Sequence, residues 1–193
     1  MTRAINRVLM LLLAAVCASA AASDIVEGNP ASSVRVTIYD DLQCNYCQTL
    51  RTMLDEKLLP RYGDKVAFIH RDLPLGRHDW ARPAAMAARW VHEQSPRLGT
   101  IFRRELLSEQ GHMTLASLKP WVSAFAARNR LSEQGIVAAL TDQRLGALVD
   151  GESQTATARG ITRIPAVYVA GKSFIETIVY EDVARAIDSV LSR

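Results

Sequence analysis

Cys44 and Cys47 are the residues of this sequence whose types and spacing are best suited to chemistry. A thiolate can attack a disulfide sulfur, and a second thiol close by can then resolve the mixed disulfide. The C-x-x-C spacing holds two thiols within that reach. We therefore interpret Cys44 as the nucleophile and Cys47 as the resolving thiol of a redox-active pair.

The segments around the pair predict how its first sulfur is activated. Val34–Tyr39 alternates apolar and polar residues, as in a strand. From Cys44 onward the apolar residues follow the spacing of one helix face, and Pro60 is expected to bend or end that helix. A helix that begins at Cys44 presents free N–H groups and the positive end of its dipole there, which lowers the pKa of a thiol.

Two other uses of a cysteine pair are weaker interpretations. An inert local disulfide closing a four-residue loop stabilises a protein by about 2 kcal/mol, less than a longer loop would. Structural zinc needs four ligands, but the sequence has no second cysteine pair. Its four histidines also lack the spacing of zinc ligands. We predict no metal site and no cofactor beyond the redox-active cysteine pair.

The first 22 residues have the pattern of a secretory signal peptide. Arg3 and Arg7 precede the apolar run Val8–Val16, and small residues with A-x-A cleavage sites follow. The apolar run is too short for a transmembrane anchor, and Val16 is too bulky to precede a lipidated Cys17. We expect cleavage and a periplasmic or secreted location, where Cys44 and Cys47 are the remaining cysteines of an oxidising compartment.

The remainder of about 170 residues is long enough for one substantial core. The whole sequence carries a formal net charge of +3, and removal of the two leader arginines brings it close to zero. Charge therefore gives no reason to expect nucleic acid as a partner.

The rest of the chain alternates between strand and helix patterns. Residues 24–33 are rich in turn formers and are expected to form an unpacked entry segment. Lys65–His70 is a second predicted strand. Five helices are then expected, at roughly 80–94, 98–109, 115–129, 133–141 and 143–158.

Strand patterns return near the end of the chain. Residues 166–169 and 173–175 flank Ala170-Gly171-Lys172, which is a hairpin signal. Residues 180–191 form an amphipathic closing helix. The predicted fold is α/β, in the order β-α-β, a helical insertion, then β-β-α.

Four stretches together resemble the DsbA-like branch of thioredoxin-fold thiol:disulfide oxidoreductases, in particular short bacterial periplasmic members. They are YDDLQCNYC (39–47), RDLPLGRH (71–78), the alanine-rich segment after it, and RGITRIPAVYVAGK (159–172). The resemblance implies a thioredoxin fold with an inserted helical subdomain. Its parts would be residues 1–22 (signal peptide), 33–77 (fold, first part), 78–157 (helical insertion) and 158–193 (fold, second part).

The resemblance also implies roles for single residues. Pro165 matches a cis-proline beside the active cysteines, and Ile164 before it would offer backbone hydrogen bonds to the substrate. Asp41 matches an aspartate near the first cysteine, where a modulating role and a loop or capping role are both open. His78 matches a histidine that orients the first inserted helix, with a modulating role as the alternative.

Two departures from the family pattern affect the expected chemistry. Relatives place a buried acid six residues before the nucleophile, whereas this chain has Ile38 there. Relatives also have Pro-Tyr or Pro-His between the cysteines, whereas this chain has Asn45 and Tyr46. Asn45 does not fix the backbone as proline does, and Tyr46 adds no positive charge. We expect both to modulate the redox poise toward a less oxidising value.

The predicted function is oxidation of dithiols in unfolded or reduced secreted proteins, with a membrane redox partner that restores the disulfide. Reductase and isomerase activity on the same scaffold are the alternatives. An isomerase of this class usually carries a separate dimerisation domain, for which the stretch before Val34 is too short. A non-enzymatic chaperone or copper-binding protein remains open because two thiolates suit Cu(I). A peroxidase or transferase has no support beyond the fold.

Overall fold

The computed structural model describes residues 24–193, so the predicted signal peptide lies outside the described residues. Its strands are β1 (Ile25–Gly28), β2 (Arg35–Asp40), β3 (Ala67–Asp72), β4 (Ala166–Val169) and β5 (Lys172–Ile175). They form one sheet in the order β1-β3-β2-β4-β5, in which β2 and β3 are parallel and the other neighbours are antiparallel.

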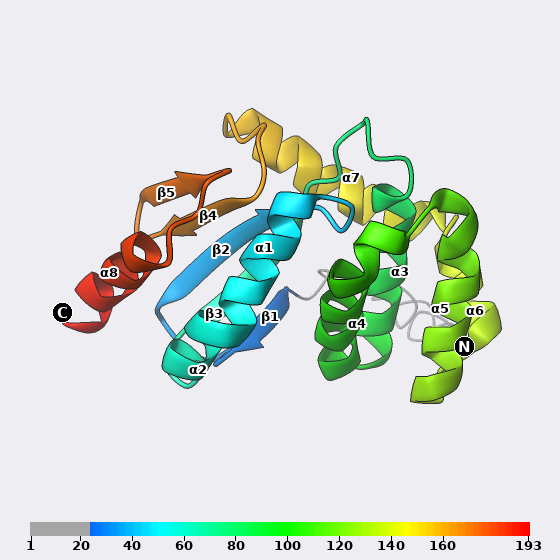
Figure 1. Ribbon diagram of the computed structural model, residues 1–193, viewed down its shortest axis with the longest axis horizontal. Helices are drawn as coiled ribbons and strands as arrows, with labels where there is room; N and C mark the ends of the chain where they lie inside the picture. The colour runs from blue at the N-terminus through cyan, green and yellow to red at the C-terminus, as the bar shows by residue number, and fades with distance from the viewer. Residues whose placement is uncertain (1–23) are drawn as a thin grey trace, which may run out of the picture.

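Helices α1 (Asn45–Met53) and α8 (Tyr180–Leu191) cover one face of the sheet (Figure 1). A π-helical turn, Leu54–Leu58, and the short α2 (Leu59–Tyr62) extend α1. Strand residues such as Ile38 and Val167 pack there with Leu50 and Leu54 and with Val183 of α8. The alternation of apolar residues along the strands and the 3.6-residue period of the helices both serve this core.

The remaining helices form a group between β3 and β4 in the chain. They are α3 (Ala81–Gln94), α4 (Pro96–Glu109), α5 (Leu115–Asn129), α6 (Glu133–Ala139) and α7 (Gln143–Ala158), with a 3₁₀ turn at Gln110–His112. Figure 1 shows α3 to α6 beside the β1 edge and α7 behind the sheet. A second apolar cluster joins these helices to the end of β2 and contains both Cys44 and Cys47.

The expected unpacked entry segment is wrong for residues 25–28. They form β1, an edge strand that pairs antiparallel with β3, and Ile25 is buried. Four residues are too few to show an alternation, and Gly28, Asn29 and Pro30 give the stretch the composition of a turn. The pairing with His70 and its neighbours is a long-range contact that the local sequence does not indicate.

Pro60 does not end the helical segment. It lies in the first turn of α2, where a missing N–H is tolerated, and the helix continues to Tyr62. The π-helical turn before it places the change of helical geometry at Leu54–Leu58. The two-residue turn between β4 and β5 has positive φ at Ala170 and Gly171, as a tight hairpin requires.

Among the described residues, no helix combines the length and apolar character needed to cross a bilayer.

Candidate active site

Cys44 is the N-cap residue of α1, with the extended backbone conformation usual at that position. Strand β2 ends four residues earlier, and a short loop turns the chain into the helix. The Cys44 N–H donates to the carbonyl of Asp41, and the Cys44 carbonyl accepts from the N–H of Cys47 at 2.9 Å. The structure therefore places Cys44 at the start of a helix, as predicted.

Both cysteines are free thiols, and they differ in their surroundings. Cys44 retains 5% of its surface and Cys47 retains 2%. Asn45 and Tyr46, between them, are exposed, and Tyr46 is 68% exposed. Tyr46 is thus the exposed residue of the C-x-x-C segment, beside a nearly buried Cys44.

The arrangement separates the pKa values of the two thiols. The Cys47 thiol, which hydrogen-bonds to the Cys44 sulfur, lowers the pKa of Cys44 most. Burial opposes this, but the backbone N–H groups of Cys47 and Tyr46 also stabilise the thiolate, so the pKa falls to about 6. Burial raises the pKa of Cys47 well above 9, and the bond to Cys44 and the charge of Asp40 add to the rise. One thiolate and one thiol at neutral pH are the states that disulfide exchange needs.

We predict that the reduced protein alkylates at one thiol only near neutral pH. The rate of iodoacetamide modification should rise with pH around a midpoint near 6, because Cys44 deprotonates there. Peptide mass mapping should place the label on Cys44 and leave Cys47 unmodified. A midpoint near the ordinary thiol value, or equal labelling of both cysteines, would contradict this assignment.

Buried Asp41 and partly buried His78 form a contact close to the cysteines. The Asp41 carboxylate accepts from the N–H of Gln43 at 2.7 Å and of Leu75 at 2.8 Å, and it lies 2.7 Å from His78 Nδ1. Burial raises the pKa of Asp41, although these hydrogen bonds act against it. The negative charge of Asp41 raises the pKa of Cys44. This geometry supports a capping and loop-fixing role, with an electrostatic influence on the thiolate as a secondary one.

Ile164 and Pro165 enter the same region from the other end of the sequence. The bond between them is cis, and Ile164 belongs to the buried cluster that contains both cysteines. Ala166, the next residue, pairs with Tyr39 of β2. Within residues 24–193, the backbone groups of Ile164 have no hydrogen-bond partner in the protein. They are available to an extended peptide.

A buried group of charged side chains lies behind Cys47, and sequence reasoning did not identify it. His70 Nδ1 lies 3.1 Å from Asp40 and Nε2 lies 3.0 Å from Glu27, so both ring nitrogens face carboxylates. Burial lowers the pKa of His70, but the two carboxylates outweigh burial and the net pKa is raised. Arg103 of α4 pairs with Asp40, and its Nη1 lies 2.6 Å from Asp72.

A buried acid, Asp40, lies four residues before the nucleophile and not six. Ile38, six residues before Cys44, is a core residue. Burial raises the pKa of Asp40, but Arg103 and then His70 lower it more, and the net pKa is below its usual range. A carboxylate held as an anion raises the pKa of Cys47 without accepting its proton. In the sequence, His70 within an otherwise apolar stretch was a sign of this buried charged group. Its partners could not be identified because they are distant in the sequence.

Two glutamines connect the cysteine segment with the helical insertion, and neither was predicted to do so. The Gln43 side chain accepts from the N–H of Trp80 and donates to Asp79, just before α3. Gln110 Nε2 donates to the carbonyl of Cys44. Glutamines in loops and helix ends are common, so the sequence alone gave no signal for either.

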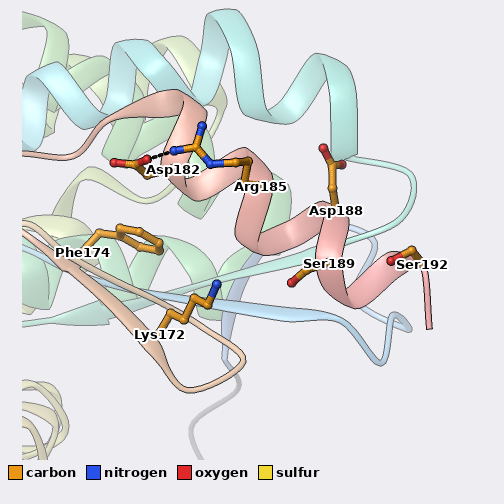
Figure 2. A pocket seen from close by; sticks show the side chains of 7 residues that line it. All are labelled: Lys172, Phe174, Asp182, Arg185, Asp188, Ser189 and Ser192. Carbon is orange, nitrogen blue, oxygen red and sulfur yellow. Dashed lines mark hydrogen bonds and ion pairs between the residues drawn. The ribbon is translucent and has the colours of Figure 1, made fainter.

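A hollow in the surface lies away from this site. It has a volume of about 730 Å³ and lies between β5 and α8 (Figure 2), lined by Lys172, Phe174, Asp182, Arg185, Asp188, Ser189 and Ser192. It contains neither cysteine, and Arg185 is already paired with Asp182. Within residues 24–193, no three histidine, cysteine or acidic side chains are arranged to hold a metal ion.

Comparison with known proteins identifies related sequences and folds. A family model described as Thioredoxin matches residues 20–189. No curated protein matches the sequence significantly.

Several solved structures share the fold at low identity. BdbD from Bacillus subtilis (oxidised) has a TM-score of 0.79 and 19% identity, over 88% of this chain and 94% of that chain. The thiol-disulfide exchange protein alpha-DsbA2 from Wolbachia pipientis has a TM-score of 0.72 and 19% identity, over 86% of each chain. The catalytic domain of Proteus mirabilis ScsC has a TM-score of 0.72 and 18% identity, over 89% and 91%. The predicted thioredoxin fold with a helical insertion is thereby confirmed.

Proposed function

This chain belongs to the thioredoxin family, and from that premise we propose that it is a thiol:disulfide oxidoreductase that oxidises dithiols in secreted proteins. The observation that supports this most is the position of Cys44 as the N-cap residue of α1 with Cys47 one turn on, which displaces the pKa values of the two thiols in opposite directions. It prepares one sulfur for exchange and keeps the other protonated.

The exchange balances with the groups at the site. A client thiolate attacks the Cys44 sulfur of the Cys44–Cys47 disulfide, that bond breaks, and Cys47 leaves and takes up a proton. A second client thiolate then attacks the client sulfur of the mixed disulfide, and Cys44 leaves as a thiolate. Two electrons pass from the client dithiol to the pair, and the client gains a disulfide.

Stabilisation of the Cys44 thiolate favours the oxidising direction, because only the reduced protein contains it. A pKa of about 6 lies one unit below neutral pH. One unit corresponds to about 1.4 kcal/mol, or about 30 mV for a two-electron couple. This contribution to the reduction potential is smaller than that of a thiol whose pKa is near 3.5.

We predict a reduction potential between those of thioredoxin and of the most oxidising relatives. These are about −270 mV and about −120 mV. Asn45 and Tyr46 lack the fixed backbone and the positive charge that further stabilise a thiolate. Equilibration with glutathione buffers of known ratio, followed by quantification of the reduced and oxidised protein, measures the potential. A value equal to that of the most oxidising relatives would contradict this prediction.

The client is an extended stretch of an unfolded or reduced secreted protein. Ile164, with its unpartnered backbone groups, offers an edge for such a stretch. Exposed Tyr46 offers apolar contact beside Cys44. The sequence pattern of residues 1–22 supports a periplasmic or secreted location. Repeated turnover there requires a membrane redox partner that reoxidises the cysteines.

The function is tested by running the reaction in both directions with the same preparation. Oxidised protein is mixed with reduced, unfolded ribonuclease A, and reduced protein is mixed with insulin. We expect disulfides to form in the ribonuclease faster than insulin is reduced. The reverse order would make the protein a reductase. Failure of both reactions would overturn the enzymatic function, and Cu(I) retained at purification would then favour metal binding.

A further inference from the structure

The side chain of Gln110 reaches from the helical insertion to the nucleophilic cysteine. It follows α4 directly, in the 3₁₀ turn Gln110–His112, and it is 5% exposed. Its Nε2 donates to the carbonyl oxygen of Cys44 at 3.0 Å, and this hydrogen bond is buried. The two residues are 66 positions apart in the sequence.

The Cys44 carbonyl is the first acceptor of α1. It also accepts from the N–H of Cys47 at 2.9 Å and of Gln48 at 3.1 Å. No side-chain oxygen caps this helix, because the cap position is occupied by a cysteine. Gln110 adds a donor from outside the helix to this carbonyl and so restrains the peptide plane between Cys44 and Asn45.

The peptide plane between Cys44 and Asn45 leads directly into the first turn of α1. The N–H groups of Tyr46 and Cys47, which belong to that turn, stabilise the Cys44 sulfur as a thiolate. A hydrogen bond that holds this peptide plane in place therefore helps to keep those donors in position for the anion.

The insertion that carries Gln110 is itself anchored near the pair. The Gln48 side chain donates to the carbonyl of Ser108 at 3.2 Å, and Arg103 pairs with Asp40. Helix α4 and the turn after it are thus held both against α1 and against the end of β2. These contacts set the position of Gln110 beside Cys44.

We propose that Gln110 is a positioning residue through which the helical insertion fixes the backbone of Cys44 and sets the reactivity of its sulfur. The proposal rests on the proposed function, since it assigns a role in the same exchange reaction. Gln110 acts through the Cys44 carbonyl and not through direct contact with the client.

Two variants separate the donor from the shape of the side chain. Gln110→Met keeps the length and apolar contacts but has no donor, whereas Gln110→Lys keeps a donor. With Gln110→Met we expect the pKa of Cys44 to rise by roughly half a unit and the alkylation rate below pH 6 to fall about threefold. With Gln110→Lys we expect the wild-type pKa or a lower one. In the wild type the titratable groups that act on Cys44 are Cys47 and Asp41, and both are unchanged in these variants. Gln110→Lys adds a positive charge that by itself lowers the pKa of Cys44, so the rise in Gln110→Met carries the test of the donor.

The readouts are the pH profile of Cys44 alkylation and the reduction potential of each variant. Gln94→Leu is the matched control, because Gln94 also donates to a backbone carbonyl, that of Trp90, at an exposed site away from the cysteines. It should leave both readouts unchanged. Circular dichroism and thermal unfolding establish that each variant is folded. If Gln110→Lys does not fold, the result for Gln110→Met is sufficient to test the proposal.

The outcomes distinguish this proposal from the function on which it rests. A wild-type pKa in Gln110→Met, or equal rises in both variants, would overturn the role of Gln110. Lack of a low-pKa thiolate in the wild type would overturn the assignment of Cys44. A low pKa that depends on Gln110, in a protein inactive in both directions, would retain this inference and overturn the proposed oxidoreductase activity.

Discussion

Replacement of Cys44 by serine is expected to reduce disulfide exchange to the uncatalysed background in both directions. The serine hydroxyl is not ionised at neutral pH and forms no disulfide, so neither step of the exchange can start. Cys47→Ser should behave differently. Its Cys44 can still attack a client disulfide, but the mixed disulfide has no resolving thiol and should accumulate as a covalent complex.

Non-reducing gels and intact mass measure that complex after incubation with a client disulfide. Cys47→Ser should show the added mass of one client chain, and Cys44→Ser should show none. The wild-type protein is the control, because its Cys47 resolves the mixed disulfide and no stable complex should accumulate. Wild-type rates in Cys44→Ser would exclude the assigned nucleophile.

Arg103→Met is expected to lower the free energy of unfolding by about 3 to 5 kcal/mol, because it leaves buried carboxylates without their shared partner. Arg103 is 1% exposed and pairs with both Asp40 and Asp72. His70 and Arg89 still contact the two acids in the variant, which places the loss toward the lower end of that range. Urea unfolding followed by circular dichroism measures the difference.

Arg144→Met provides the control for this prediction. Arg144 pairs with Glu93 at the surface, where its side chain is more than half exposed. An exposed pair contributes up to about 1 kcal/mol, so little change is expected. Similar losses in the two variants would mean that the buried pairs add no more stability than a surface pair does.

The local sequence was sufficient to predict most elements of the fold. The closing helix was expected and found at 180–191, because its apolar residues keep a helical period between clear boundaries. The five inserted helices lie within a few residues of their predicted bounds. The strands expected at 34–39 and 65–70 begin one and two residues later. Strand boundaries are set by pairing with neighbours, which the local pattern does not contain.

The site was predictable only where its residues are close in sequence. Cys44, Cys47 and the loop around Asp41 follow from a short motif. Gln110 and Arg103 reach the same region from helices more than 60 residues away. Each is an ordinary polar residue in an amphipathic segment, and only packing of the insertion against the sheet shows its target. The sequence showed that position 38 is not acidic, but it did not predict that Asp40 would be a buried acid near the cysteines.

The two carboxylates that meet Arg103 also limit how the protein can move. Helix α4 carries the guanidinium, whereas Asp40 and Asp72 end the two parallel strands at the centre of the sheet. A hinge motion that lifted the helical insertion from the sheet would separate unlike charges in a medium that cannot solvate them. The ion pairs of Arg103 therefore oppose such a motion and hold α4 against the ends of β2 and β3.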